Sequence, residues 1–98
     1  MTITQTKNGT NLTVALEGRL DTMTSPELEQ AMRTALDDVD TLTLDLANLV
    51  YISSAGLRVL LTLHKRMAGK GGMTVTHVGE IVQEVFDVTG FSGVLTIA

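Results

Sequence analysis

Two segments of this 98-residue chain alternate apolar with polar residues, which is the pattern of a strand with one buried face. The alternating apolar positions are Leu12, Val14 and Leu16 in the first segment and Leu42, Leu44 and Leu46 in the second. A Thr-rich stretch, residues 2–6, precedes the first segment, and the Asn8-Gly9 pair between them suits a type I′ turn. We therefore expect an edge strand over residues 2–6, joined by a hairpin to a strand that stops before Gly18.

Two further segments repeat their apolar residues with the period of an amphipathic helix. The first starts at Ser25-Pro26, with Ser25 as N-cap and Pro26 as the first helical residue. Its apolar positions are Leu28, Ala31, Met32, Ala35, Leu36 and Val39, and two adjacent aspartates, residues 37–38, indicate its end. The second helix is expected from about Ser54 to Ala68. Its apolar arc is wide, which indicates deep burial or a face shared with a partner.

The rest of the chain continues to alternate strand with helix. Glycines over residues 69–72 end the second helix and turn the chain. A strand over 73–78, a short helix over 79–89 and a last strand over 94–97 follow, and Gly90 suits the C′ position of that helix. The order β-β-α-β-α-β-α-β predicts an α/β protein with a mixed, mostly parallel sheet of four to five strands, an N-terminal hairpin and three helices. We expect one domain, residues 1–98.

Composition and charge narrow the function classes. The chain has no cysteine, and its net charge of −4 argues against direct nucleic-acid binding, which needs a basic surface. Lys65, Arg66 and Lys70 form only a small basic cluster, which a solvated helix face explains. No run approaches the ~20 apolar residues of a membrane span, and no signal peptide is evident, so we expect a cytoplasmic protein without membrane insertion.

The segment Ser53-Ser54-Ala55-Gly56 carries the most informative chemistry. Two hydroxyls lie where a predicted strand gives way to a helix N-terminus, where backbone N–H groups are unpaired and negative charge is favoured. Ser54 could be an N-cap whose side chain satisfies one of those N–H groups, or a phosphoacceptor, and both can hold at once.

Catalysis and metal binding are weaker alternatives. Ser54-Ala55-Gly56 matches the second half of the nucleophile elbow G-x-S-x-G, but Ile52 replaces the first glycine. The two histidines, His64 in an apolar stripe and His77 near a strand end, show no metal-ligand spacing. We therefore expect no enzyme activity, no catalytic residue, no bound metal and no cofactor.

Four stretches of the sequence carry a family resemblance: Gly18-Arg19-Leu20-Asp21; Ser25-Pro26-Glu27-Leu28; Asp45-Leu46 through Ile52-Ser53-Ser54-Ala55-Gly56-Leu57; and Val85-Phe86 with Thr89-Gly90-Phe91. Together they resemble a STAS domain, specifically the single-domain anti-sigma factor antagonists of bacteria, over essentially the whole chain.

The resemblance implies a switch that two enzymes control. The unmodified domain would bind an anti-sigma factor that is also a serine kinase, which frees a sigma factor. The kinase would phosphorylate the serine that aligns with Ser54, and a serine phosphatase would reset the domain. Asp21 would lie near Ser54 and shape the docking surface. We expect that surface to contain Asp21, Ser53, Ser54, Ala55, Gly56 and Arg58 on a monomer or weak dimer.

This sequence departs from the family pattern next to the acceptor. The residue before the acceptor is usually Asp in this family, and here it is Ser53, which becomes a competing, second-choice acceptor. The alternative function is an unphosphorylated STAS adaptor, such as the small subunit of a lipid-transport ATPase complex. In that case the same helix face would be a permanent docking surface.

Overall fold

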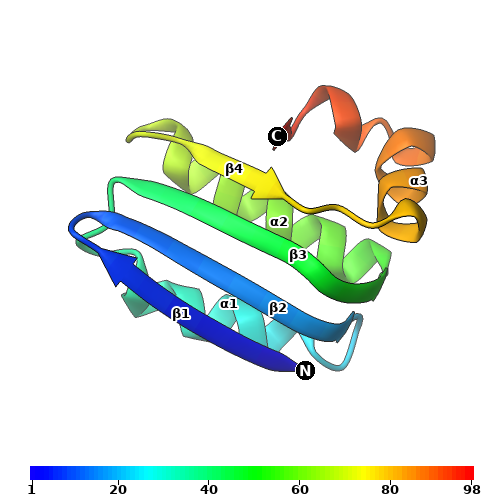
Figure 1. Cartoon of the computed structure of the whole chain (residues 1–98), viewed down its shortest axis with the longest axis horizontal. Helices are drawn as coiled ribbons and strands as arrows, with labels where there is room; N and C mark the ends of the chain where they lie inside the picture. Colours follow the sequence, from blue (N-terminus) through cyan, green and yellow to red (C-terminus); the bar gives the residue numbers. More distant parts are fainter.

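Five strands form one mixed sheet in the computed structural model, which describes all 98 residues, and three helices accompany it (Figure 1). The elements are β1 (Thr2–Asn8), β2 (Asn11–Leu20), α1 (Ser25–Ala35), β3 (Thr41–Ile52), α2 (Ser54–Ala68), β4 (Met73–Thr76), α3 (Glu80–Thr89), a single 3-10 turn (Phe91–Gly93) and β5 (Thr96–Ile97). The strands lie in sequence order, β1 pairs antiparallel with β2, and every other pairing is parallel. The predicted fold class is confirmed.

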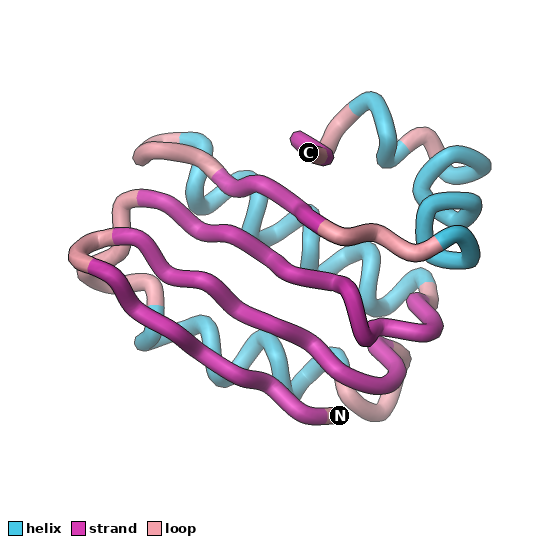
Figure 2. The backbone as a smooth tube through the Cα atoms, in the orientation of Figure 1, coloured by secondary structure: helices cyan, strands magenta, loops and turns pink.

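Helices α1 and α2 lie side by side on one face of the sheet, whereas α3 sits beyond the end of β4 (Figures 1 and 2). The alternating residues of β2 and β3 point into the layer between sheet and helices, where Val14 and Leu44 are fully buried. From α2, Leu60 and Met67 are also fully buried and complete this layer. The periodic apolar residues of the strands and helices therefore form a single core between one face of the sheet and the two helices.

The opposite face of the sheet has no helix over it and is lined with threonine. One row crosses all five strands in register and consists of Thr6, Thr13, Thr43, Thr74 and Thr96. Parallel sheets are usually covered on both faces, because their strands are apolar on both sides. Threonine allows this face to stay uncovered, since it favours extended backbone and carries a hydroxyl that water can solvate.

Several element boundaries differ from the sequence-based expectation. The hairpin turn consists of Gly9 and Thr10, and only Gly9 has a positive φ, of 64°, so the expected type I′ turn is wrong. β4 ends at Thr76, and β5 contains only two residues because the 3-10 turn occupies the preceding segment. α1 ends at Ala35, although Leu36 and Val39 remain fully buried in the turns that follow.

The two ends of α1 (Ser25–Ala35) have different polar partners. The expected N-cap, Ser25, is instead the first helical residue, and Thr24 is the N-cap. At the other end Lys70 Nζ donates to the carbonyls of Leu36 at 2.9 Å and Val39 at 3.0 Å, while Arg66 donates to those of Met32 and Arg33. The basic cluster is therefore not merely a solvated face, because Arg66 and Lys70 bind carbonyl oxygens at the C-terminal end of α1 and just beyond it, where positive charge is favoured.

Candidate functional site

The junction between β3 and α2 places the two adjacent serines in different roles. Ser53 is extended, with φ −100° and ψ 176°, and its N–H donates to the carbonyl of Leu20 at 2.9 Å. Its hydroxyl accepts a long hydrogen bond, 3.4 Å, from the N–H of Gly56. Ser53 is therefore the N-cap of α2, and the expectation that Ser54 caps this helix is wrong. The hydrogen bond to Leu20 decides it, because it keeps Ser53 extended at the end of the strand, just before the helix.

Ser54 is the first residue of α2 and is exposed to solvent. Its hydroxyl makes no hydrogen bond, and the first turn of α2 contains no acidic residue. The helix start therefore presents a free hydroxyl in a region where unpaired N–H groups favour negative charge.

Gly56 brings the start of α2 against the end of β2. A Cβ atom at this position would lie 2.8 Å from the Leu20 carbonyl oxygen and 2.8 Å from Ile52 Cγ1, far inside van der Waals contact. Gly56 is buried, so it serves packing, whereas its neighbour Ala55 is half-buried at the surface. This close approach of α2 to the ends of β2 and β3 sets the distance of Ser54 from the sheet.

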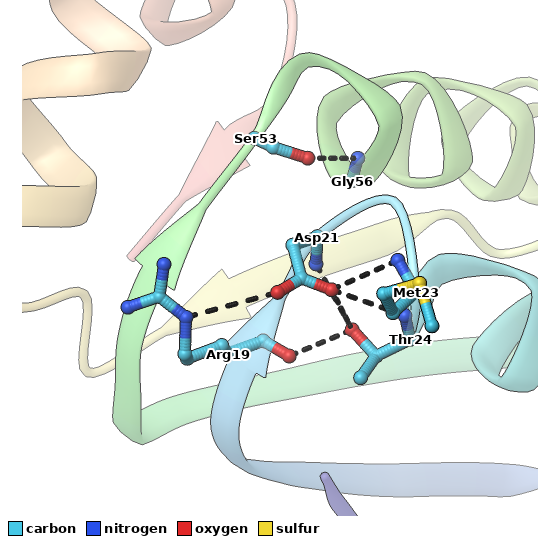
Figure 3. Close-up of polar contacts among 6 residues, drawn as sticks. All are labelled: Arg19, Asp21, Met23, Thr24, Ser53 and Gly56. Carbon is cyan, nitrogen blue, oxygen red and sulfur yellow. Dashed lines mark hydrogen bonds and ion pairs between the residues drawn. The ribbon is translucent and has the colours of Figure 1, made fainter.

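Asp21, directly after β2, organises the loop that leads into α1 (Figure 3). Its Oδ1 accepts from the N–H groups of Met23 at 3.0 Å and Thr24 at 3.1 Å. The hydroxyl of Thr24 donates to the Arg19 carbonyl at 2.7 Å and accepts from the Asp21 N–H at 2.9 Å. Because Ser53 hydrogen-bonds to Leu20, the residue just before Asp21, the network lies beside the start of α2.

The same network sets the charge state of Asp21. The backbone hydrogen bond from Thr24 is the largest cause that holds the pKa of this carboxyl below its ordinary value of 3.8. The N–H of Met23 and the charge of Arg19, whose Nε lies 3.7 Å from Asp21 Oδ2, lower it further. Arg19 also stacks over Tyr51, 4.2 Å from the ring centroid.

Sequence reasoning missed three residues that build this frame: Arg19, Thr24 and Tyr51. The spacing of Asp21 and Thr24, three residues apart before a helix, is a signal that could have identified the loop network. The contact of Arg19 with Tyr51 depends on the register of β2 and β3, which pairs them directly and which no local pattern shows.

A shallow hollow of about 210 Å³ lies between the starts of α1 and α2. Its polar and charged walls come from Thr22, Ser25 and Glu29 on one side and Arg58 and Thr62 on the other, and Ala55 and Val59 also line it. Ser25 is only 3 % exposed, and its hydroxyl has no hydrogen-bond partner. The hollow is therefore lined by Ala55, the residue that follows the serine pair, and Ser25 carries a buried hydroxyl without a partner.

The remaining candidates of the sequence lie elsewhere. His64 is half-buried on α2, and its Nδ1 has no partner. His77 directly follows β4, and its Nδ1 lies 3.2 Å from Asp45 Oδ1. No three side chains of the metal-ligating types are grouped so that they could hold an ion. None of the helices combines the length and apolar character needed to cross a bilayer.

Together the fold and the site define a small α/β domain with a free serine hydroxyl at a helix start. A family model described as "Mlab, STAS domain" matches residues 3–96. The chain belongs to the STAS domain family.

Relatives of known sequence or structure support this assignment. BtrV of Bordetella bronchiseptica, provisionally named an anti-sigma factor antagonist, is 32 % identical over 100 residues, which cover 100 % of this chain and 86 % of BtrV. The crystal structure of an anti-sigma factor antagonist from Mycobacterium paratuberculosis superposes with a TM-score of 0.88 at 24 % identity, over 98 % of this chain and 83 % of that one.

SpoIIAA of Bacillus, an anti-sigma factor antagonist, shares the fold. Its unphosphorylated form has a TM-score of 0.84 at 18 % identity, over 99 % of this chain and 88 % of that one. Its phosphorylated form has a TM-score of 0.76 at 17 % identity, over 99 % of this chain and 91 % of that one. Relatives of this chain are thus anti-sigma factor antagonists, and the solved structures bear out its five-stranded sheet with three helices.

Proposed function

We propose that this protein is an anti-sigma factor antagonist that is switched by phosphorylation of Ser54. The unmodified domain binds an anti-sigma factor that is also a serine kinase, and this binding frees a sigma factor. The kinase transfers the γ-phosphoryl group of ATP to the Ser54 hydroxyl, which loses its proton, and ADP leaves. A serine phosphatase hydrolyses the phosphate and resets the domain.

The single observation that carries this proposal is the free hydroxyl of Ser54. A kinase needs a hydroxyl that can reach its active site, and Ser54 offers an exposed one at the first position of α2 with no competing hydrogen bond. Ser53 is the poorer acceptor, because its hydroxyl is engaged with the N–H of Gly56. The phosphorylated and unphosphorylated forms described for SpoIIAA support such a switch on this fold.

The docking surface surrounds Ser54 and contains Asp21, Ser53, Ala55 and Arg58. Gly56 lies behind it and contributes by packing. A phosphate adds a charge of about −1.5 to −2, which the open start of α2 accommodates within the free domain. In a contact with another protein the same charge must be desolvated, at a cost of several kcal/mol where it finds no partner. Such a cost lowers affinity by orders of magnitude, so phosphorylation releases the partner.

The test is phosphorylation by the candidate kinase, best taken from the neighbouring gene. The domain is incubated with kinase and ATP, and the site is located by mass spectrometry in the wild type and in the matched variants Ser54→Ala and Ser53→Ala. We expect phosphate on Ser54, loss of labelling in Ser54→Ala and retention in Ser53→Ala. Phosphate confined to Ser53 would show that the assigned acceptor is wrong, and a domain that binds the kinase but is never labelled would contradict the switch.

A second candidate is the unphosphorylated adaptor, favoured by two observations. The description of the family model names Mlab and does not mention a sigma factor. In addition, Ser53 occupies the position at which the anti-sigma factor antagonists usually have Asp. In that case the face around Ser54 is a permanent interface. Stable co-purification with a transport ATPase that Ser54→Ala leaves unchanged would favour the adaptor over the switch.

A further inference from the structure

Arg58 differs from the other arginines of the chain. Three of the four have a carboxylate within ion-pair distance: Arg19 with Asp21 at 3.7 Å, Arg33 with Glu29 at 3.9 Å and Arg66 with Asp37 at 3.0 Å. Arg58 is exposed and forms no ion pair; only its backbone carbonyl is engaged, by the hydroxyl of Thr62 at 3.0 Å. Its guanidinium group is therefore free to bind an anion.

The helix places Arg58 beside Ser54. Four residues along α2 correspond to a rise of about 6 Å and a rotation of about 40° around the axis, so the two side chains share one face. Side chains of a helix lean toward its N-terminus, which directs the long arginine side chain back over the first turn. Arg58 also lines the hollow, about 60° around the axis from Ala55, so it lies between the hollow and the acceptor serine.

We propose that Arg58 is the ligand of the phosphate on Ser54, and that phosphorylation acts by withdrawing this arginine from an acidic group of the docked protein. This inference rests on the proposed function for the phosphate itself. Guanidinium groups bind phosphate through paired hydrogen bonds, and the unpaired N–H groups at the start of α2 add to the attraction. No acidic residue in the first turn competes for that place.

The hollow indicates what Arg58 binds in the unmodified protein. Arg58 and Glu29 are its only charged lining residues, and Glu29 lies within reach of Arg33. Ser25 also lines the hollow, but its unpaired hydroxyl is buried and closed to solvent. Arg58 is thus the cation that the hollow offers to a docked protein, which suits a carboxylate of the partner. When the phosphate takes Arg58, the hollow keeps only the negative charge of Glu29 and repels that carboxylate.

The experiment measures the phosphate directly and needs no kinase. Phosphoserine is installed at position 54 by genetic encoding, and ³¹P NMR follows its second ionisation, which lies near pH 6 for an unperturbed group. The protein is compared with Arg58→Gln, Arg58→Lys and Lys65→Gln. Lys65→Gln is the matched control, because it removes the same charge from an exposed position of α2 about three turns from Ser54. Circular dichroism confirms that each variant is folded.

We expect the pKa of the phosphate to rise by roughly half a pH unit in Arg58→Gln, to rise less in Arg58→Lys and to stay unchanged in Lys65→Gln. Equal values in the wild type and Arg58→Gln would overturn the inference. An equal rise in both Gln variants would also overturn it, because that result reflects net charge alone. Failure of a kinase to label Ser54 would contradict the proposed function without affecting this measurement.

Binding supplies the second arm of the test. If phosphorylation acts by withdrawing Arg58, the variant Arg58→Gln binds the anti-sigma factor more weakly than the wild type before phosphorylation. Phosphorylation then lowers its affinity by a smaller factor than in the wild type. If phosphorylation lowered the affinity of Arg58→Gln and of the wild type by the same factor, the phosphate would repel the partner directly. That result would refute the withdrawal of Arg58.

Discussion

The two long helices start at the same end of the sheet, but their starts differ. At α1, Asp21 accepts two backbone N–H groups through one oxygen, and Thr24 ties the loop to the end of β2. At α2, a single serine accepts one N–H at 3.4 Å, and no acidic residue follows in the first turn. We call the start of α1 closed, because the carboxylates of Asp21 in the preceding loop and Glu27 in the first turn lie beside it. The start of α2 is open, because no carboxylate lies in its first turn, so it can still gain from added negative charge.

The C-terminal ends sharpen the difference. Arg66 and Lys70, at the end of α2 and just beyond it, donate hydrogen bonds to carbonyls at the end of α1. The C-terminal end of α1 is therefore stabilised by basic side chains that the end of α2 supplies. At the opposite end of α2, in contrast, the hydroxyl of Ser54 has no partner.

The largest expected effect comes from breaking the contact that holds the two starts together. Gly56→Ala should lower the free energy of unfolding by about 2–3 kcal/mol, because the added methyl group collides with the backbone of Leu20. Urea denaturation measures the loss. Gly69→Ala, at the other end of α2, is the matched control, since nothing lies within 4 Å of its added Cβ. Equal effects of the two substitutions would contradict the packing role of Gly56.

A charge placed at the open start should affect binding and leave the fold intact. We expect Ser54→Asp to weaken binding of the anti-sigma factor by about tenfold or more relative to the neutral variant Ser54→Asn, which corresponds to ~1.4 kcal/mol. Thermal denaturation should show nearly unchanged stability, since the helix start favours the charge. Isothermal titration calorimetry measures the affinity. A large drop in melting temperature would show that the start of α2 is not open.

The closed start should respond to acid. The pKa of Asp21 is lowered in the folded state, so its stabilising contribution is complete well above pH 3.8 and is lost as the pH falls through the folded-state value. Asp21→Asn should therefore lower the urea midpoint at pH 7, and the difference from the wild type should shrink below about pH 3.8.

The pKa values of Asp38 and Asp87 are also lowered, by hydrogen bonds from Lys7 and Ser92, respectively. Both carboxyls are present in the wild type and in Asp21→Asn, so their effect cancels in the difference. A difference that persists unchanged at pH 2 would contradict the role of the Asp21 charge.

The smallest expected effect tests the weak cap of α2. Ser53→Ala should cost about 0.5 kcal/mol, at the low end of the range for N-cap serines, because its hydrogen bond is long. Ser54→Ala should change stability less, since its hydroxyl makes no hydrogen bond. The two variants are compared by thermal denaturation under identical conditions. If Ser54→Ala proved the more destabilising, the assignment of the cap to Ser53 would be wrong.

Periodic features of the sequence predicted the structure well. The bounds of α2, Ser54 and Ala68, agree with the prediction, because the apolar arc is continuous and is followed by glycine. Gly90 ends α3 with a φ of 81°, as its position implied. β3 proved longer than its alternating pattern, since the pairing of β2 with β3 shifts register after Ala15 and continues to Ile52.

The helix starts could not be predicted to the residue. At both starts a serine stood in a favourable cap sequence, and at both the residue before it took the cap position. For Ser25 the reason is burial, which turns its side chain inward while Asp21 receives the loop N–H groups. For Ser54 it is the hydrogen bond from Ser53 to Leu20. Both causes are contacts with β2 and its loop that local propensity does not encode.

The threonine row on the open face of the sheet limits how other molecules can recognise this protein. Each strand contributes the same side chain at the same height, from Thr6 at one edge to Thr96 at the other. Because this surface repeats every ~4.8 Å, a binding partner could bind it in several equivalent registers with similar affinity. A partner that binds in one orientation must therefore contact the edge of the domain where the helices begin, because the side chains there do not repeat.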